Sequence, residues 1–518
     1  PYRRQRQMCI RDRLLCYFFL YKIKNRSIIN DEAGDIMAKM DARRREMILK
    51  GDLMKTILII CLPLALYQFF NSCYTLLDQV ICAQISTTAQ NAVSSISQIK
   101  SAISAFGAGL AAGGGVLVSR FYGAGEVKKA RHASSNLFFL SILVSALLML
   151  LFIPLAVPIM KLCQIAEDSI AIGKTYFRLQ LLELAFVSLN NVFIGLEKAK
   201  GNSKIILKLN LLVLIIKLAF TCLFVFGFDL KDIVFVELAT IIGQVTLTTI
   251  GLFYLFGKNN VIRLSLGMIF PKKEYTLPIL KLSLPIFLGK FVMSMGKVVV
   301  NGICGKYWNT VTDGLIVGTL GVSNNMCGLI TSPTNSFEEG ESSIVSQNLG
   351  NGNLKRAVRA FYKTLIVSTI ISVIGYVLMR FVFINQLVEL FTSADEKSSL
   401  YKDMVKEIFV WDSLSIIVLG INAAVLGLLY GFGKTGLSTV LNFSRIGSRI
   451  LILLILHAAN PNLSPTLCAG LSMGISNTII LLLSFVFLFI FLIGLKRKGF
   501  KGMKLTDPEP EVSNLNFD

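Results

Sequence analysis

The chain has 518 residues, of which 54% are hydrophobic and only 16% are charged, and its formal net charge is +21 at pH 7. That apolar content excludes an ordinary water-soluble fold and indicates a protein that crosses a membrane many times. The positive charge does not indicate nucleic-acid binding, because the lysines and arginines stand in short loops between apolar runs, where they orient helices in a bilayer.

The first 36 residues differ from everything that follows. The segment PYRRQRQMCIRDR and the following LLCYFFLYKI imitate the basic and apolar regions of a signal peptide but lack a small-residue cleavage site. We therefore expect residues 1–36 to be a non-native or disordered extension, with Met37 or Met40 as the start, and we assign them no function.

Apolar runs of about 20 residues follow, each long enough to cross a bilayer as a helix. Twelve such spans cover residues 54–80, 92–118, 134–158, 173–196, 205–228, 233–257, 278–304, 314–338, 361–384, 404–430, 436–457 and 466–495. Basic residues cluster in every second loop, as at Lys198, Lys200 and Lys204, and after the last span, whereas the other loops are poor in lysine and arginine. The positive-inside rule then places both termini on the cytoplasmic side of the membrane. We expect that membrane to be the plasma membrane.

A sequence repeat divides the spans into two sets of six. SRFYGAGEVKKARHA at residues 119–133 recurs as SQNLGNGNLKRAVRA at residues 346–360, a constant offset of 227 residues from Ser119 to Ser346. Because each half has an even number of spans, both copies have the same orientation in the membrane. The glycines of each copy are expected to cap a helix that leaves the membrane.

We therefore predict an all-α integral membrane protein with twelve transmembrane helices in two pseudo-symmetric six-helix lobes that face each other. The N-lobe is expected to cover residues 37–258, a cytoplasmic linker residues 259–277, the C-lobe residues 278–495 and a cytoplasmic tail residues 496–518.

The first span carries residues that an apolar helix does not keep without a reason. Pro63 deletes a backbone hydrogen bond and bends or loosens the helix, so it is a candidate hinge, as is Pro285 at the matching place of the seventh span. Asp78 is a carboxylate at membrane depth, where a charge costs roughly 2.5–3.5 kcal/mol, and Asn71 lies two turns below it on the same face. We expect these residues to serve ion coupling; the alternative is that Asp78 marks the helix end.

Taken together, these patterns resemble the multidrug and toxic compound extrusion (MATE) family over about residues 45–495. The resemblance rests on the duplicated twelve-span plan and on Pro63, LLD ending at Asp78, GAGLAAGGGVLVSRFYGAG (107–125), SSIVSQNLGNGN (342–353), LATIIGQ (238–244) and LYGFGKT (429–435). It implies secondary active export of small amphipathic, often cationic compounds, driven by a proton or sodium gradient through a central cavity that opens alternately to each side.

The resemblance also implies an ion-coupling site, with Asp78 as its first-span acid. In the fifth span Lys217 departs from the acidic or amide residue common in the family. In the sixth span Thr240 matches a threonine of that site, whereas Glu237 replaces a small residue. We expect the Lys217 ammonium to take the place of a bound cation, paired with Asp78 or Glu237, which favours proton over sodium coupling. The alternative is a lysine that snorkels to an interface.

Other polar residues inside the spans are candidates for the substrate cavity: Glu183 in the fourth span, and Lys290, Lys297 and Asn301 in the seventh. We expect the two lysines to pair with acids of FEEGE at the end of the eighth span, namely Glu338, Glu339 or Glu341; the alternative is that they favour anionic or zwitterionic substrates. Asp412, beside Trp411, is expected in an aromatic belt at the outer interface.

Three other functions make different demands on the sequence. A flippase for a lipid-linked or anionic amphipathic substrate would need several cations in one cavity, and Lys217, Lys290 and Lys297 keep it open as an alternative. A membrane-embedded enzyme is disfavoured, because no HExxH motif and no paired intramembrane aspartates occur. A channel suits the hinge and the repeat less well than alternating access.

The remaining expectations concern partners. The ten cysteines and two histidines lack metal or redox spacing, so we expect no cofactor and no metal. The expected partners are small amphipathic substrates and the lipid bilayer, with no nucleic acid, and the protein is expected to be a monomer.

Overall fold

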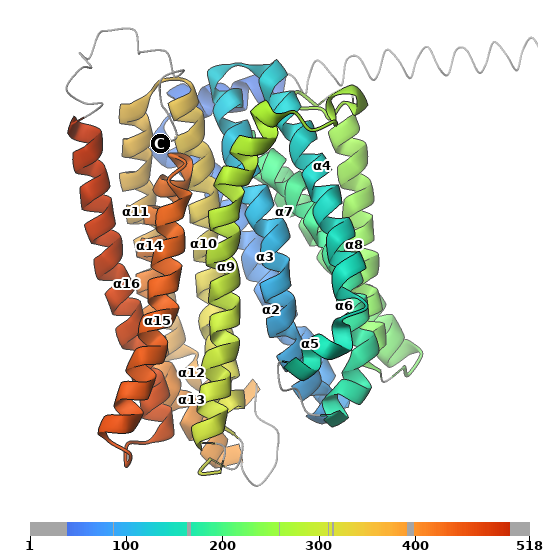
Figure 1. The fold of residues 1–518 in the computed structure, drawn as a ribbon, viewed down its shortest axis with the longest axis vertical. Helices are drawn as coiled ribbons and strands as arrows, with labels where there is room; N and C mark the ends of the chain where they lie inside the picture. Colours follow the sequence, from blue (N-terminus) through green and yellow to red (C-terminus); the bar gives the residue numbers. More distant parts are fainter. Residues whose placement is uncertain are drawn as a thin grey trace, which may run out of the picture.

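The computed structural model describes residues 39–85, 87–162, 167–230, 232–257, 260–308, 310–312, 315–390 and 398–497, and within these ranges every regular element is a helix. The helices stand in two bundles side by side (Figure 1). The expectations for residues 1–36 and for the tail beyond residue 497 lie outside the described residues.

The N-terminal bundle follows a short helix at residues 39–50. Its helices are α2 (Leu53–Ile85), α3 (Thr87–Ala124), α4 (Val127–Phe152), α5 (Ala156–Leu162), α6 (Glu167–Ala199), α7 (Ser203–Cys222), extended by a π-helical turn at Leu223–Gly227, and α8 (Ile233–Phe256). Six of them, all but the short α5, correspond to the first six predicted spans.

The C-terminal bundle follows a 3-10 turn at Leu266–Met268. Its helices are α9 (Lys273–Trp308), α10 (Ile316–Gly350), α11 (Leu354–Val377), extended by a π-helical turn at Leu378–Val382, α12 (Ile384–Leu390), α13 (Ser398–Asp412), α14 (Leu414–Gly431), α15 (Thr435–Ala459) and α16 (Pro465–Leu495). The predicted tenth span is shared by α13 and α14, which meet at Ser413.

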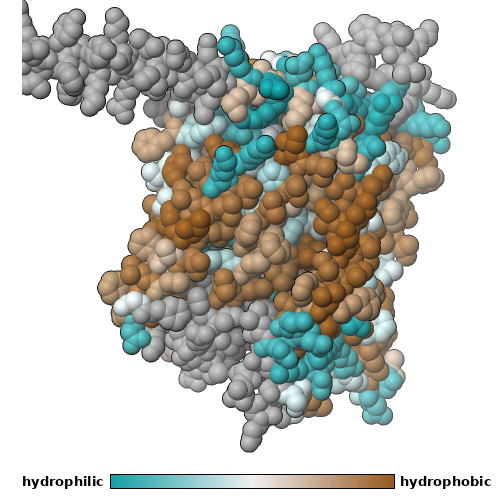
Figure 2. Space-filling model, turned by 180° about the vertical axis from the view of Figure 1, so that it is seen from behind, coloured by the Kyte–Doolittle hydropathy of each residue, from teal (hydrophilic) through white to brown (hydrophobic). Residues whose placement is uncertain are grey.

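Eleven helical segments in the described part of the chain are long and apolar enough to cross a membrane. The exception among the predicted spans is α10, which is 35 residues long but carries many serines and three glutamates. These polar side chains are tolerated because α10 lies between the bundles, where Ser336, Glu341 and Ser343 are buried. Figure 2 shows a broad hydrophobic band between hydrophilic ends, as expected of a multi-pass membrane protein. The predicted all-helical membrane fold is thus confirmed.

The bundles meet along two antiparallel helix pairs, α3 with α9 and α2 with α10. Small residues let α3 approach α9: a Cβ at Gly109 or Gly113 would collide with the backbone of Phe287 or Ser283. Further along the pair, the Phe106 and Phe287 rings stack at 4.0 Å. The two predicted six-helix lobes correspond to these bundles in helix order, while their residue boundaries stay a prediction.

The two candidate hinge prolines lie inside uninterrupted helices. Pro63 is inside α2 and Pro285 is inside α9. The Thr439 hydroxyl of α15 donates to the Pro285 carbonyl oxygen at 2.6 Å, which ties this part of α9 to its neighbour. Whether either proline acts as a hinge stays a prediction.

Candidate functional site

The two copies of the repeat meet at one end of the molecule, which we call the basic end because it carries the lysine- and arginine-rich loops. Arg120 at the end of α3 donates to the Gly431 carbonyl of α14 at 2.9 Å. Its repeat counterpart, Gln347 of α10, donates to the Ala199 carbonyl of α6 at 2.7 Å. Each bundle thus binds the last turn of a helix in the other, and these reciprocal bonds close the basic end.

The repeated glycines have two different roles in this contact. Gly125 and Gly352 have φ values of +81° and +78°, so they end their helices as the sequence analysis predicted. Gly123 and Gly350 instead let the two backbones touch, since a Cβ at Gly123 would collide with the Gln347 carbonyl and a Cβ at Gly350 with that of Arg120. The motif is therefore more than a pair of helix caps.

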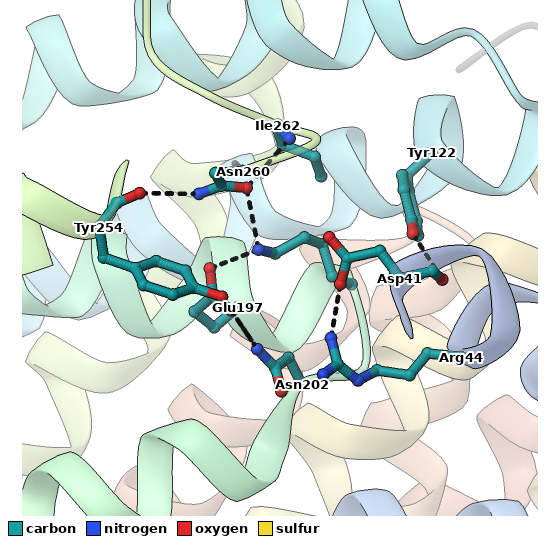
Figure 3. Close-up of polar contacts among 9 residues, drawn as sticks. Asp41, Arg44, Tyr122, Glu197, Asn202, Tyr254, Asn260 and Ile262 are labelled. Carbon is teal, nitrogen blue, oxygen red and sulfur yellow. Dashed lines mark hydrogen bonds and ion pairs between the residues drawn. The ribbon is translucent and has the colours of Figure 1, made fainter. Parts of the chain in front are cut away.

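The helix at residues 39–50 crosses the basic end and contacts both bundles. Tyr122 of α3 donates to the Asp41 carbonyl at 3.1 Å, and Asp41 also forms an ion pair with Arg44 (Figure 3). From the other bundle, Arg356 donates to the Ile48 carbonyl at 3.0 Å. This segment therefore holds the bundles together at the closed end.

A buried ion pair lies just inside the basic end of the N-terminal bundle (Figure 3). Lys200 Nζ is 2.6 Å from Glu197 Oε1, and both residues are 0% exposed. Asn260 Oδ1 accepts from Lys200 at 3.0 Å, and Asn202 Nδ2 donates to Glu197 Oε2 at 2.7 Å. The expectation that Lys200 orients its helix from a loop is therefore wrong: Gly201, with φ +75°, turns the chain so that Lys200 neutralises Glu197 inside the bundle.

A cavity of about 70 Å³ lies between the bundles next to the closed end. Its walls come from α3 and α6 on one side and from α9, α10 and α14 on the other. An ion pair between Lys198 of α6 and Glu339 of α10 crosses it, and Lys290, Glu338 and Tyr430 also line it. That volume has room for a few water molecules only, so the bundles are closed at this level.

The acids of FEEGE divide between two environments. Lys290 lines the central cavity with Glu338 and Glu339 and acts on both carboxyl groups electrostatically, but it forms no ion pair with either one in the described structure, so the pairing stays a prediction. Glu341 points elsewhere, toward Gly427 of α14 and Cys61 of α2. It is 0% exposed, and among the described residues neither of its carboxyl oxygens has a hydrogen-bond partner. Glu341 is therefore not a partner of Lys290.

An acidic cluster lies within the N-terminal bundle, made by Lys100 of α3, Gln180 and Glu183 of α6 and Glu237 of α8. The Lys100 ammonium forms an ion pair with Glu183 and lies 3.8 Å from Glu237 Oε1. Gln180 Nε2 donates to Glu237 Oε2 at 3.4 Å. Glu183 and Glu237 are each 3% exposed, so this one lysine faces two buried carboxyl groups.

The chemistry of the acidic cluster follows from its charge balance. The two carboxyl groups are buried close enough to act on each other electrostatically, and two such neighbours disfavour the state in which both are ionised. Within the cluster, two carboxylates, one ammonium and one proton sum to zero charge, and loss of the proton leaves one net negative charge, with Lys217 as a further cation acting on Glu237. Two buried carboxyl groups that share one ammonium can hold one exchangeable proton.

Two other predicted coupling residues, Lys217 and Thr240, have other partners. Lys217 of α7 lies 3.8 Å from the ring centroid of Tyr74 of α2, whose hydroxyl is 3.1 Å from Thr221 Oγ1. Thr240 is buried and its hydroxyl donates to the Val236 carbonyl at 3.2 Å.

The two candidate ion-coupling residues of the first span, Asn71 and Asp78, both belong to α2. Asn71 is exposed on α2. Asp78 is part of α2, but its side chain lies outside the described residues, so its pairing with Lys217 stays a prediction. The ion pair described for Glu237 is with Lys100 instead.

The C-terminal bundle contains a cluster of opposite character, which we call the cationic cluster: Lys297 of α9 with Arg445 and Arg449 of α15. Asp412 is beside it, at the end of α13. Asp412 is 4% exposed and accepts from Ser323 Oγ of α10 at 3.1 Å. The expectation that Asp412 lies in an outer aromatic belt is therefore wrong, because α13 and α14 form one crossing and Asp412 stands near its middle.

Asn301, the remaining cavity candidate, joins the two bundles. Its Nδ2 lies 3.3 Å from Oε1 of Gln98 on α3 and donates to it. Asn301 lies one turn beyond Lys297 on the same helix, so this face of α9 looks toward the N-terminal bundle.

Sequence reasoning missed Lys100, Gln180, Arg445 and Arg449. Three of these are charged residues inside predicted spans: Lys100 in 92–118, and the two arginines in 436–457. The rule that singled out Asp78, that an ionisable residue inside a span is functional by default, applies equally to them. Gln180 carries no comparable signal.

Comparison with known proteins agrees with this architecture. A sequence profile of the MatE family matches residues 63–223 and 285–455. Multidrug export protein MepA of Staphylococcus saprophyticus is 25% identical over 197 residues, covering 38% of this chain and 44% of that protein. MepA of Staphylococcus aureus is 23% identical over 350 residues, covering 67% of this chain and 74% of that protein.

Solved structures show the same fold. A MOP superfamily transporter from Pyrococcus furiosus, described as having a binding pocket of reverse polarity, matches with a TM-score of 0.79 at 18% identity and covers 87% of this chain and 98% of its own. An outward-facing multidrug resistance MATE family transporter matches with a TM-score of 0.79 at 17% identity, with the same coverage.

Proposed function

This chain belongs to the MATE family of membrane transporters, and on that premise we propose that it is a proton-coupled exporter of small amphipathic compounds. The similar staphylococcal proteins are named multidrug export proteins, which supports export of several compounds. The alternation of basic loops supports an orientation with the basic end in the cytoplasm of a bacterial cell.

The acidic cluster carries the proposal. Glu237 lies one turn after the start of α8, and α8 starts at the face of the molecule opposite the basic end. A proton that enters from outside the cell therefore meets Glu237 before it meets the deeper residues of α8. Proton binding neutralises the cluster and lets α3, α6 and α8 pack closely, while release on the inner side restores a buried negative charge that disfavours that packing. The change in charge is the step that couples the ion to the movement of the two bundles.

The contacts at the basic end supply the other half of the cycle. In the closed state, Arg120 and Gln347 bind across the bundles and the central cavity is small. Opening requires these bonds and the Lys198–Glu339 ion pair to separate. Cytoplasmic substrate would then enter between α6 and α10, and alternating access follows from rocking of the bundles about α2, α3, α9 and α10.

Proton coupling fits the cluster better than sodium coupling. A sodium ion would have to share the carboxyl oxygens with the Lys100 ammonium, which repels it. A proton binds a carboxyl oxygen directly and leaves the ammonium in place.

The flippase alternative requires several cations around one headgroup. Lys217 lies over Tyr74, Lys290 lines the central cavity with Glu338 and Glu339, and Lys297 stands with the arginines of α15. The three lysines have different neighbours, which argues against one pyrophosphate cavity built from them.

The test uses purified protein in liposomes with either ethidium or carboxyfluorescein as the transported dye. We expect dye movement to follow a pH gradient and to be unchanged by a sodium gradient at fixed pH. Glu237→Gln and Glu183→Gln should each lower the pH-driven rate at least tenfold, because an amide cannot exchange the proton.

The matched control is Glu126→Gln, an exposed glutamate at the basic end paired only with Lys129 among the described residues. It should transport like the wild type. Dye movement that follows sodium, or equal pH-driven rates in wild type and Glu237→Gln, would refute proton coupling through this cluster.

A further inference from the structure

The cationic cluster of the C-terminal bundle is rich in charge that the protein itself does not neutralise. Lys297, Arg445 and Arg449 interact electrostatically with one another, and Asp412 is the acid beside them. In the described part of the chain, none of the three forms an ion pair with a carboxylate. Three like charges at membrane depth are costly unless an anion joins them.

The hydrogen bonds of the cluster show the same excess of donors. Arg445 Nε donates to Asn477 Oδ1 at 2.8 Å, and Arg449 donates to the same oxygen at 3.4 Å and to Ser476 Oγ at 3.2 Å. These acceptors are neutral. The Asn477 Nδ2 group is a further donor, and it is buried with no hydrogen-bond partner among the described residues. The site therefore has donors to spare and lacks an acceptor.

Asp412 does not fill that role. Its carboxylate oxygens accept from Ser323 of α10 and Ser415 of α14, which hold it in place. One carboxylate leaves the cluster with a surplus of two positive charges.

The cluster is accessible from the space between the bundles. Lys290, Lys297 and Asn301 lie within about 20° of one direction around α9. Lys290 lines the cavity between the bundles, and Asn301 bonds to Gln98 of the N-terminal bundle. Lys297 lies between them on the same face, and its side chain is exposed although charged groups of α13 and α15 surround it. It therefore faces the path between the bundles rather than lipid.

We propose that Lys297, Arg445, Arg449 and Asn477 form a binding site for the phosphate or carboxylate group of an amphipathic anion. Two guanidinium forks and an ammonium match the oxygens of such a group. We place the apolar part of the ligand beside the half-buried rings of Phe106, Phe287 and Phe291, which pack together where α3 meets α9. The site adds an anionic class of ligand to the transporter proposed above.

The test measures binding without any gradient, so its outcome is independent of proton coupling. Both tryptophans of the chain, Trp308 and Trp411, are in the C-terminal bundle, and Trp411 is next to Asp412. Octyl phosphate, below its micelle concentration, is titrated into protein in a neutral detergent while tryptophan fluorescence is recorded. We expect saturable binding to the wild type.

Variants then identify the site. Lys297→Gln and Arg445→Gln should each weaken octyl phosphate binding at least tenfold, and Lys281→Gln, an exposed lysine on the opposite side of α9, should leave it unchanged. Because the Lys297 side chain is exposed, its replacement leaves no buried gap, and it keeps the test valid if an arginine variant misfolds. Equal affinity in wild type and Lys297→Gln would overturn the proposal.

Three further ligands define the chemistry. Octyltrimethylammonium should not compete with octyl phosphate, and competition by it would refute an anion site. Inorganic phosphate should compete at least tenfold less well, and equal competition would refute the amphipathic ligand. Nanodiscs of phosphatidylcholine with added phosphatidylglycerol separate the sources: displacement by the anionic lipid supports a lipid headgroup, and no displacement supports a free amphipath.

Discussion

The N-terminal and C-terminal bundles meet through matching residues at the basic end but carry opposite charge balances at membrane depth. At the basic end Gly123 and Gly350 make equivalent backbone contacts. At depth, Lys100 faces the two carboxyl groups of the acidic cluster, whereas the cationic cluster sets three cations against one acid.

This difference shows which part of a duplicated protein the fold constrains. The repeats have to fit against each other where they close, so both copies retain a glycine and a long donor at that place. Each cluster is built from helices of one bundle, so the two clusters can carry different ligands. The following predictions test that division.

The largest effect is expected at the shared contact. Gly123→Ala and Gly350→Ala should each reduce transport at least about tenfold, because an added Cβ overlaps the facing carbonyl oxygen and the basic end cannot close as it does here. Dye transport in liposomes measures the rate. Gly436→Ala is the matched control, since a Cβ there meets nothing within 4 Å. Reduced transport in only one of the two variants would show that the Gly123 and Gly350 contacts are not equivalent.

The next largest effect is expected in the acidic cluster of the N-terminal bundle. Lys100→Met leaves two buried carboxyl groups without their cation, which should cost about 3–5 kcal/mol of stability. The loss should be larger at alkaline than at acidic pH, because protons can neutralise the carboxyl groups only when they are available. Thermal unfolding in detergent at several pH values measures it. A loss that is the same at every pH would contradict the proposed charge balance.

The equivalent change in the cationic cluster should have the opposite sign. Lys297→Met removes one of three repelling cations and leaves no carboxylate behind, so stability should stay the same or rise by up to about 1 kcal/mol. The same unfolding assay applies, with Lys100→Met measured beside it. A destabilisation as large as that of Lys100→Met would show that Lys297 has an anionic partner within the protein.

The smallest effect concerns Asp412. Asp412→Asn keeps an acceptor for Ser323 but removes the acid beside the cationic cluster, so octyl phosphate should bind about threefold more tightly, or by about 0.7 kcal/mol. Tryptophan fluorescence titration measures the change. Weaker binding would show that Asp412 positions the arginines more than it competes with the ligand.

Much of the fold could be read along the chain. Apolar runs predicted the transmembrane helices, and the lysines and arginines of the loops predicted which side of the membrane each loop is on. The offset of 227 residues between the repeated motifs predicted the two lobes. Each of these is a local or periodic property, so no knowledge of packing is needed. The most polar crossing, α10, was still recognisable because part of it is apolar and because its end carries the repeat.

The candidate site could be predicted only in part. Glu183 and Glu237 were identified as acids inside spans, but their common partner Lys100 comes from a helix about 80 residues earlier than Glu183. Lys200 was expected in a basic loop and Asp412 at the outer membrane interface, and both are buried. Periodicity indicates that a residue is on a helix, but it does not indicate which other helix it faces.

The sequence by itself determined the membrane fold, its duplication and the family, because hydrophobicity, loop charge and repeated motifs are written in the order of the residues. Only the tertiary structure decided which charges neutralise each other. Coulomb attraction and the cost of burying a charge depend on distances between helices, and those distances are set by packing rather than by position along the chain.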